Sequence, residues 1–191
     1  MSRKRVAILC NGPSLGDHDL NKIDCETIGL NRSWELIRST HHLMTDSNQW
    51  GMYTHLTGQP IDTLEGLITG QKGPGFVQIK CHQSHKPRWS ANPLFGVYMC
   101  GTVTYAALQL AVHYFGYREI YMLGLDLAPR KASGKFWGGP WHPSIETRQR
   151  ESLGYAAAIL DRELGIDVWN VGSPNSKCAA FRHRTFGECF S

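Results

Sequence analysis

Short apolar runs, each ended by polar or glycine-rich residues, are the feature of this sequence that most limits its fold. They have the length and branched-residue content of buried strands and are found at 5–10, 27–30, 42–44, 119–123 and 166–171. Helices are predicted at 33–38, at 101–116 where apolar residues recur at helical spacing, and at 144–164. Strands that alternate with helices predict a mostly parallel sheet covered on both faces, a Rossmann-like three-layer α/β/α sandwich.

The length of 191 residues fits one compact domain, so we predict a single domain over residues 1–191. Within it, segment 51–95 is rich in glycine and proline and is predicted to be a loop-rich insertion with one strand at 76–80. A second polar, glycine-rich loop is predicted between the strand at 119–123 and the helix at 144–164.

Composition excludes several classes of protein. The hydrophobic content of 41% is enough for a core, yet no apolar run approaches the length of a transmembrane helix or signal peptide, so a cytoplasmic protein is expected. The six cysteines are far apart without a CxxC pair and are expected to be reduced thiols. A net charge of +4 suits a phosphorylated ligand but is too small to indicate nucleic acid by itself.

Polar residues directly follow four of the predicted strands, where ligands of open α/β sheets bind. Asn11 offers an amide, Gly12 lets a ligand approach the backbone, and the Ser14 hydroxyl can hydrogen-bond a phosphate oxygen. The later strands are followed by Asn31, Asp46 and Gly124-Leu125-Asp126. These residues predict a phosphate or nucleotide site that lacks both GxGxxG and GxxxxGK[ST]. The alternative is that each residue only forms a turn or caps a helix.

The order of these motifs resembles that of bacterial sialyltransferases of glycosyltransferase family 42. The resemblance covers residues 4–50 and 96–176 and is carried by 11–15, Asn31, 116–126, His142 and 173–176. The same pattern is similar to domain-of-unknown-function 115 proteins, which include a 6-hydroxymethylpterin diphosphokinase. Both resemblances imply a nucleotide site on a Rossmann-like fold.

The family 42 resemblance implies specific donor contacts. Asn11, Gly12, Ser14 and Asn31 would contact the phosphate and leaving-group region of a CMP-sugar. Asp46 stands where the family has a ribose-binding asparagine. The nucleoside pocket would be lined by Gly101, Thr102, Gly124 and Asp126. No cofactor is implied.

His142 is the predicted catalytic residue, because the resemblance places the family's general base there. Pro143 suits the first position of a helix, and the positive end of that helix would keep the His142 ring neutral and able to accept a proton. The alternative is a histidine that merely caps the helix.

Segment 127–142 would form the lid of this site. It lacks the two tyrosines that the family uses to stabilise the departing phosphate, and offers Arg130, Lys131 and Lys135, whose charges could do the same. The alternative is a solvated basic loop.

The leading hypothesis is a small glycosyltransferase that moves a sugar from a nucleotide donor to a hydroxyl acceptor, either a glycan or a hydroxylated DNA base. The acceptor site could be completed by a second copy of the chain. The first alternative is magnesium-dependent diphosphate transfer from ATP to a pterin-like alcohol, with Asp46 and Asp126 holding the metal. The second is a non-catalytic nucleotide-binding module. Cys81, His82 and His85 lack a fourth ligand at a recognisable distance, so no metal site is predicted for the leading hypothesis.

Overall fold

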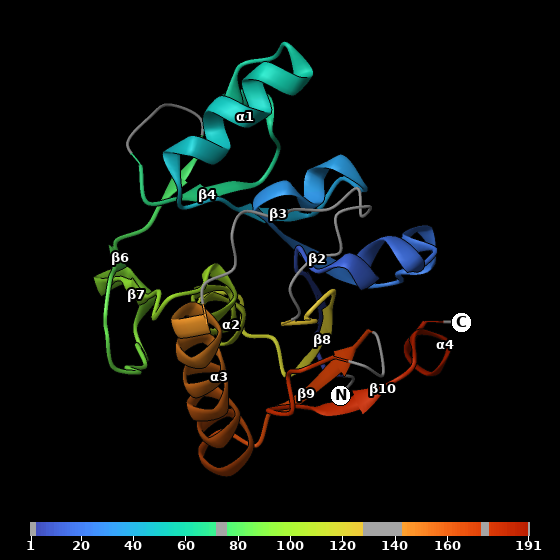
Figure 1. Ribbon diagram of the computed structural model, residues 1–191, viewed down its shortest axis with the longest axis vertical. Coiled ribbons are helices and arrows are strands. Elements are labelled where there is room, and N and C mark those ends of the chain that lie inside the picture. The colour runs from blue at the N-terminus through green and yellow to red at the C-terminus, as the bar shows by residue number, and fades with distance from the viewer. Residues whose placement is uncertain (1–2, 72–75, 128–142, 173–175, 191) are drawn as a thin grey trace.

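The fold is built on one parallel sheet. The computed structural model describes residues 3–71, 76–127, 143–172 and 176–190. Eight strands pair, all in parallel, in the order β10-β9-β8-β1-β2-β3-β4-β5, and β6 and β7 form a separate parallel pair (Figure 1). The strands are β1 (Arg5–Leu9), β2 (Glu26–Leu30), β3 (His41–Leu43), β4 (Leu67–Thr69), β5 (Val77–Gln78), β6 (Cys81–His82), β7 (Val97–Tyr98), β8 (Glu119–Leu123), β9 (Asp167–Val171) and β10 (Arg182–Arg184).

Helices and helical turns connect these strands. The α-helices are α1 (Ser47–Thr57), α2 (Val103–His113), α3 (Pro143–Ala158) and α4 (Phe186–Cys189). Short 3-10 turns are η1 (Pro13–Asp17), η2 (Leu20–Lys22), η3 (Asn31–Glu35), η4 (Ile61–Thr63) and η5 (Pro93–Phe95), and a π-helical turn, η6 (Ile159–Glu163), continues α3. Among the described residues, no helix is both long and apolar enough to cross a membrane.

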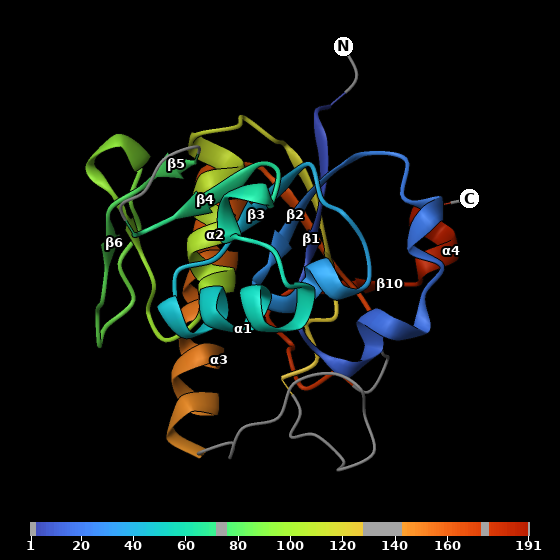
Figure 2. The same ribbon diagram turned by 90° about the horizontal axis from the view of Figure 1, so that it is seen from above.

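Both faces of the central sheet are buried, as the side chains of β1 illustrate. Val6 and Ile8 lie in a large core with α2 and α3, whereas Ala7 and Leu9 lie in a smaller core with η1, η2 and α4. Successive strand residues point to opposite faces, so an uninterrupted apolar strand needs a layer on each side. The two layers are visible on either side of β1 and β2 in Figure 2. The predicted Rossmann-like sandwich with a parallel sheet is confirmed.

The chain order reverses at β1, which fixes where a ligand can bind. β1 pairs with β2 on one side and with β8 on the other, so that Leu9 lies opposite both Gly29 and Leu123. The chain fills one half of the sheet with β2 to β5 and the other half with β8 to β10. Loops on the two sides of such a reversal diverge and leave a crevice outside the carboxyl ends of the strands.

The structure corrects several details of the sequence prediction. The helix expected at 33–38 is only the 3-10 turn η3. Segment 51–95 is not simply loop-rich, because it contains most of α1 together with β4, β5 and β6; the strand expected at 76–80 is reduced to β5. β10 and α4 were not predicted at all. The edge strand β10 is polar, and its two arginines stack on Trp169 of β9.

Candidate functional site

A buried carboxylate joins the loops that follow β1 and β8. Asp126 is only 5% exposed; one of its oxygens accepts from the Ser14 amide at 2.8 Å and the other from the Ser14 hydroxyl at 2.5 Å. The Gly12 amide donates to the Gly124 carbonyl at 2.8 Å. Four predicted site residues are therefore brought together across the reversal point. In this arrangement the Ser14 hydroxyl proton is directed to Asp126 rather than toward a ligand.

Glycine is required where these two loops touch. A Cβ atom on Gly12 would lie 2.2 Å from the Gly124 carbonyl oxygen and 2.6 Å from Oδ2 of Asp126. Gly124 itself has a φ of +69°, in the left-handed region that favours glycine. The need for Gly12 is thus explained by the contact between loops, independently of any ligand.

Two amide side chains at neighbouring strand ends have unused hydrogen-bonding capacity. The Oδ1 atoms of Asn11, after β1, and Asn31, after β2, are buried and have no hydrogen-bond partner among the described residues. Nine buried side-chain atoms of the described residues lack a partner, and these two lie at the ends of neighbouring strands where the chain order of the sheet reverses. Buried polar atoms are usually paired, so their common location calls for an explanation. An amide oxygen accepts hydrogen bonds, so a ligand between the two strand ends could supply the missing partners through hydroxyl or amino groups, while the Nδ2 groups could donate to its anionic oxygens.

The first turn of α2 lies beside the end of β1. The Thr104 hydroxyl is 3.9 Å from the Cys10 sulfur, which places the positive end of this helix next to Asn11. Burial raises the pKa of the Cys10 thiol to about 12, so the sulfur stays neutral and does not repel an anion. The predicted residues Gly101 and Thr102 immediately precede α2.

Asp46 and Thr102 both have a capping role, as the alternative interpretation allowed. Asp46 accepts from the Asn48 amide at 2.9 Å and starts α1, and Thr102 accepts from the Thr104 amide at 3.2 Å and starts α2. Asp46 is exposed after β3, whereas Asp126 is buried and bonded to Ser14. Within the part of the chain that the structure describes, no three His, Cys, Asp or Glu side chains converge to hold a metal ion.

The remaining predicted residues lie outside the described residues. They are His142, Arg130, Lys131 and Lys135, which belong to the predicted lid. The helix that His142 was predicted to precede does begin at Pro143, as α3.

A buried histidine beneath Asn31 was not predicted as part of the site. His42 of β3 has no exposed surface, and its Nε2 lies 2.7 Å from the backbone oxygen of Asn31. Burial lowers the pKa of His42 from 6.5 to about 4, and the hydrogen bond to Asn31 offsets only part of that effect. The one sequence signal for this arrangement is Gly29, a glycine inside a strand, which often marks the close approach of another group.

His42 predicts a loss of stability at mildly acidic pH. The unfolded chain binds a proton at this ring below about pH 6.5 and the folded chain only below about pH 4, so stability falls as the pH drops through this window. Between pH 7.5 and pH 5 we expect a loss of about 2 kcal/mol from this residue. Urea unfolding at the two pH values measures it. His42→Gln should reduce the loss by that amount; an unchanged pH dependence in the variant would contradict the assignment.

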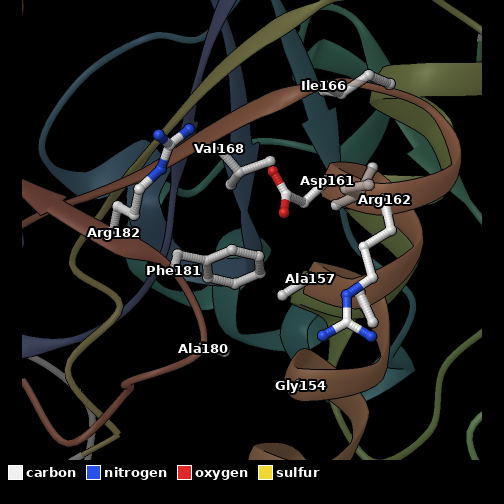
Figure 3. A pocket seen from close by; sticks show the side chains of 11 residues that line it. Gly154, Ala157, Asp161, Arg162, Ile166, Val168, Ala180, Phe181 and Arg182 are labelled. Atoms are coloured by element: carbon white, nitrogen blue, oxygen red, sulfur yellow. The ribbon is translucent and has the colours of Figure 1, made fainter.

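A hollow of about 370 Å³ lies elsewhere, between α3, η6 and the strands β9 and β10. The Asp161 carboxylate points into it toward Val168 and Phe181 (Figure 3). It is lined by Ile166, directly before β9, by Val168 of β9, and by Ala180 and Phe181, directly before β10, so it lies toward the amino-terminal ends of these strands. It is therefore separate from the crevice at the reversal point.

The parallel sheet and the polar loops at its reversal point define a Rossmann-like α/β protein with a candidate ligand site at the carboxyl ends of its strands. Among solved structures, this protein is similar to the sialyltransferase CstII from Campylobacter jejuni, solved in complex with a substrate analogue, cytidine 5′-monophosphate. The two structures align with a TM-score of 0.59 and 16% sequence identity, over 98% of this chain and 87% of the CstII chain. CstII in complex with a trisaccharide acceptor and CMP gives a TM-score of 0.55 and 15% identity, over 98% and 88% of the two chains. This likeness shows a shared fold. No protein-family model and no curated protein sequence matches the chain.

Proposed function

We propose that this protein is a glycosyltransferase that transfers a sugar from a CMP-sugar-like donor to a hydroxyl acceptor. The observation that carries the proposal is the pair of buried asparagine Oδ1 atoms, of Asn11 and Asn31, that have no partner in the described part of the chain and lie at the reversal point of the sheet. The fold shared with CstII, which was solved with CMP, supports a cytidine nucleotide as the occupant. A glycan is the acceptor we favour, since CstII was also solved with a trisaccharide acceptor.

The donor would lie across the ends of β1, β2 and β8. The Nδ2 groups of Asn11 and Asn31 would donate to its phosphate and leaving-group oxygens, and their Oδ1 atoms would accept from hydroxyl groups of the donor. The positive end of α2 would favour the phosphate charge. The Ser14–Asp126 pair would keep the loop after β1 in shape beneath the donor. Gly101, Thr102 and Gly124 would border the nucleoside, and Asp46 would accept hydrogen bonds from the ribose hydroxyls.

The chemical step would use the lid and the start of α3. The acceptor oxygen forms a bond to the anomeric carbon of the sugar while the bond from that carbon to the phosphate oxygen breaks. His142 takes the proton from the acceptor hydroxyl, and the CMP leaves with the bonding electrons. Arg130, Lys131 and Lys135 would neutralise the charge that develops on the departing phosphate.

Titration with cytidine nucleotides tests the donor site. We expect CMP to bind, and expect Asn11→Ala and Asn31→Ala each to weaken binding about 10-fold, the usual effect of losing one or two hydrogen bonds to a charged ligand. Asn21→Ala is the matched control, because Asn21 is exposed on η2 and should leave the affinity unchanged. Calorimetry with CMP, UMP and their sugars would contradict the proposal if none of these ligands bound.

His142→Ala is expected to lower the rate of sugar transfer at least about 100-fold while CMP binding is retained, because general-base catalysis contributes 10²–10⁴-fold. Release of CMP from a CMP-sugar in the presence of acceptor measures the rate. His85→Ala, a substitution of an exposed histidine, is the control. Unchanged transfer by the His142 variant would remove this residue from the mechanism.

The same assays separate the alternative functions. Magnesium-dependent formation of AMP from ATP in the presence of a pterin alcohol would indicate diphosphate transfer. Nucleotide binding without turnover of any donor would indicate a binding module. Salt-dependent affinity for duplex DNA would indicate a hydroxylated base as the acceptor.

A further inference from the structure

A partly buried hydrogen-bond chain, centred on the buried ring of His42, runs from the loop after η3 to the end of β2. The ring of His42 lies between the Ser39 hydroxyl, 3.1 Å from Nδ1, and the backbone oxygen of Asn31, 2.7 Å from Nε2. A carbonyl oxygen can only accept a hydrogen bond, so Nε2 carries the proton and its N–H donates a hydrogen bond to the Asn31 oxygen. Nδ1 is then the acceptor, and the Ser39 hydroxyl donates to it. One tautomer of a neutral ring satisfies both contacts.

The residue at the end of this chain has an unusual backbone. Asn31 has a φ of +46°, which places it in the left-handed region that costs a non-glycine residue free energy. This conformation directs the Asn31 carbonyl to His42, while the side-chain Oδ1 is buried without a partner among the described residues. The left-handed backbone of Asn31 thus determines the direction in which its side-chain amide points.

The neighbouring strand leaves room for the ring. Gly29 lies opposite His42 in the register of β2 and β3. A Cβ atom on Gly29 would approach both Nδ1 of His42 and Oγ of Ser39 to 2.6 Å. A side chain of any other residue at position 29 would displace the ring from the Asn31 carbonyl. The absence of a side chain at Gly29 therefore allows the His42 ring to reach the carbonyl of the left-handed Asn31.

We infer that His42 is a positioning residue, which holds Asn31 in its left-handed conformation so that the Asn31 amide faces the nucleotide phosphate of the donor. The part of this inference that concerns the nucleotide rests on the proposed function. His42 itself does not touch the donor and acts through Asn31.

The first test uses CMP affinity and a rescue. His42→Leu removes the N–H group that donates to the Asn31 carbonyl and should weaken CMP binding about 10-fold. In His42→Gln, the side-chain Nε2 can donate to the same carbonyl, so CMP affinity should return to within about threefold of the wild type. His113→Leu and His113→Gln are matched controls. His113, at the end of α2, is partly buried and its Nε2 accepts from the Trp89 indole N–H; its variants should leave CMP affinity unchanged. Equal affinity of the His42→Leu variant and the wild type would overturn the inference, as would failure of glutamine to rescue.

The second test needs no nucleotide. In the wild-type background, Asn31→Ala should raise the unfolding equilibrium constant about 5- to 10-fold more than Asn31→Gly, because only glycine adopts the left-handed conformation at no cost. In the His42→Leu background this difference should shrink to less than about twofold, since residue 31 is no longer held there. A difference that persists would overturn the inference. If His42→Leu does not fold, Ser39→Ala is used as the background instead. It should partly reduce the difference in unfolding equilibrium constant between Asn31→Ala and Asn31→Gly. If the wild type binds no nucleotide, the proposed function fails, and this cycle still decides the role of His42.

Discussion

Replacing Asp126 by alanine is expected to destabilise the protein by about 4 kcal/mol and to abolish CMP binding. The substitution removes two charge-assisted hydrogen bonds and leaves the buried Ser14 amide without a partner, and each such loss costs about 1–3 kcal/mol. The bond from the Gly12 amide to the Gly124 carbonyl would remain, but the turn at Ser14 would lose its contacts with Asp126 and could shift together with Asn11. Urea unfolding gives the stability, and calorimetry at a temperature where the variant is folded gives the affinity.

Two further variants show whether the effect belongs to the clamp between Ser14 and Asp126. Ser14→Ala keeps the amide contact and loses only the hydroxyl, so it should cost about 1–2 kcal/mol. Asp161→Ala removes an exposed carboxylate on η6 and should change stability by less than about 0.5 kcal/mol. A cost for Asp126→Ala as small as that for Asp161→Ala would show that the two loops are not held together by this carboxylate.

The sequence predicts the large strands of this fold well and its small or polar elements poorly. β1 and β8 each contain four consecutive apolar residues, and β2 and β9 are largely apolar, because both faces of the sheet are covered; such runs are recognisable without a structure. α1 buries only Gln49 and Tyr53 and so has no apolar stripe. In the sequence, only residues at the two ends of α1 indicate a helix: Asp46, which caps its start, and Gly58, which ends it in a left-handed conformation.

β10 illustrates a second limit. Its three residues are Arg, His and Arg, and it becomes a strand because the guanidinium groups of Arg182 and Arg184 lie 4.3 and 3.6 Å from the ring centroid of Trp169. No local pattern reveals such a contact, since it depends on a residue of another strand.

For the candidate site, the sequence predicts which loops meet but not how they are joined. Parallel strands bring their following residues to one edge, so the proximity of Gly12, Ser14, Gly124 and Asp126 could be expected. The bond between Ser14 and Asp126 spans 112 positions in the chain and follows only from the order of β1 and β8 in the sheet. It gives the Asp126 carboxylate a role in holding the loop, which the sequence did not indicate; its contact with a nucleoside stays a prediction.

One buried side chain explains why the segment from β6 to β7 is ordered although its sequence is rich in proline and glycine. Gln109 of α2 has no exposed surface, and its Oε1 accepts from the amides of Ser90 and Tyr98, each at 3.1 Å. Its Nε2 donates to the carbonyl oxygens of Tyr98 at 2.8 Å and Tyr105 at 2.9 Å. A single amide thus replaces the strand partner that β7 lacks on its side toward α2.

Gln109→Met is expected to destabilise the protein by about 4 kcal/mol, because two backbone N–H groups and one carbonyl would lose their partners in an apolar surrounding of nearly unchanged volume. Urea unfolding measures the loss, and Gln83→Met, an exposed substitution in the same segment, should change stability by less than about 0.5 kcal/mol. Hydrogen exchange locates the effect. The Ser90 and Tyr98 amides should be protected in the wild type and exchange rapidly in the variant, while the amides of β8 remain protected under native conditions. If the Ser90 and Tyr98 amides stayed protected in Gln109→Met, the segment would be held to α2 by its other contacts, those of Trp89 with His113 and of Tyr105 with Arg88.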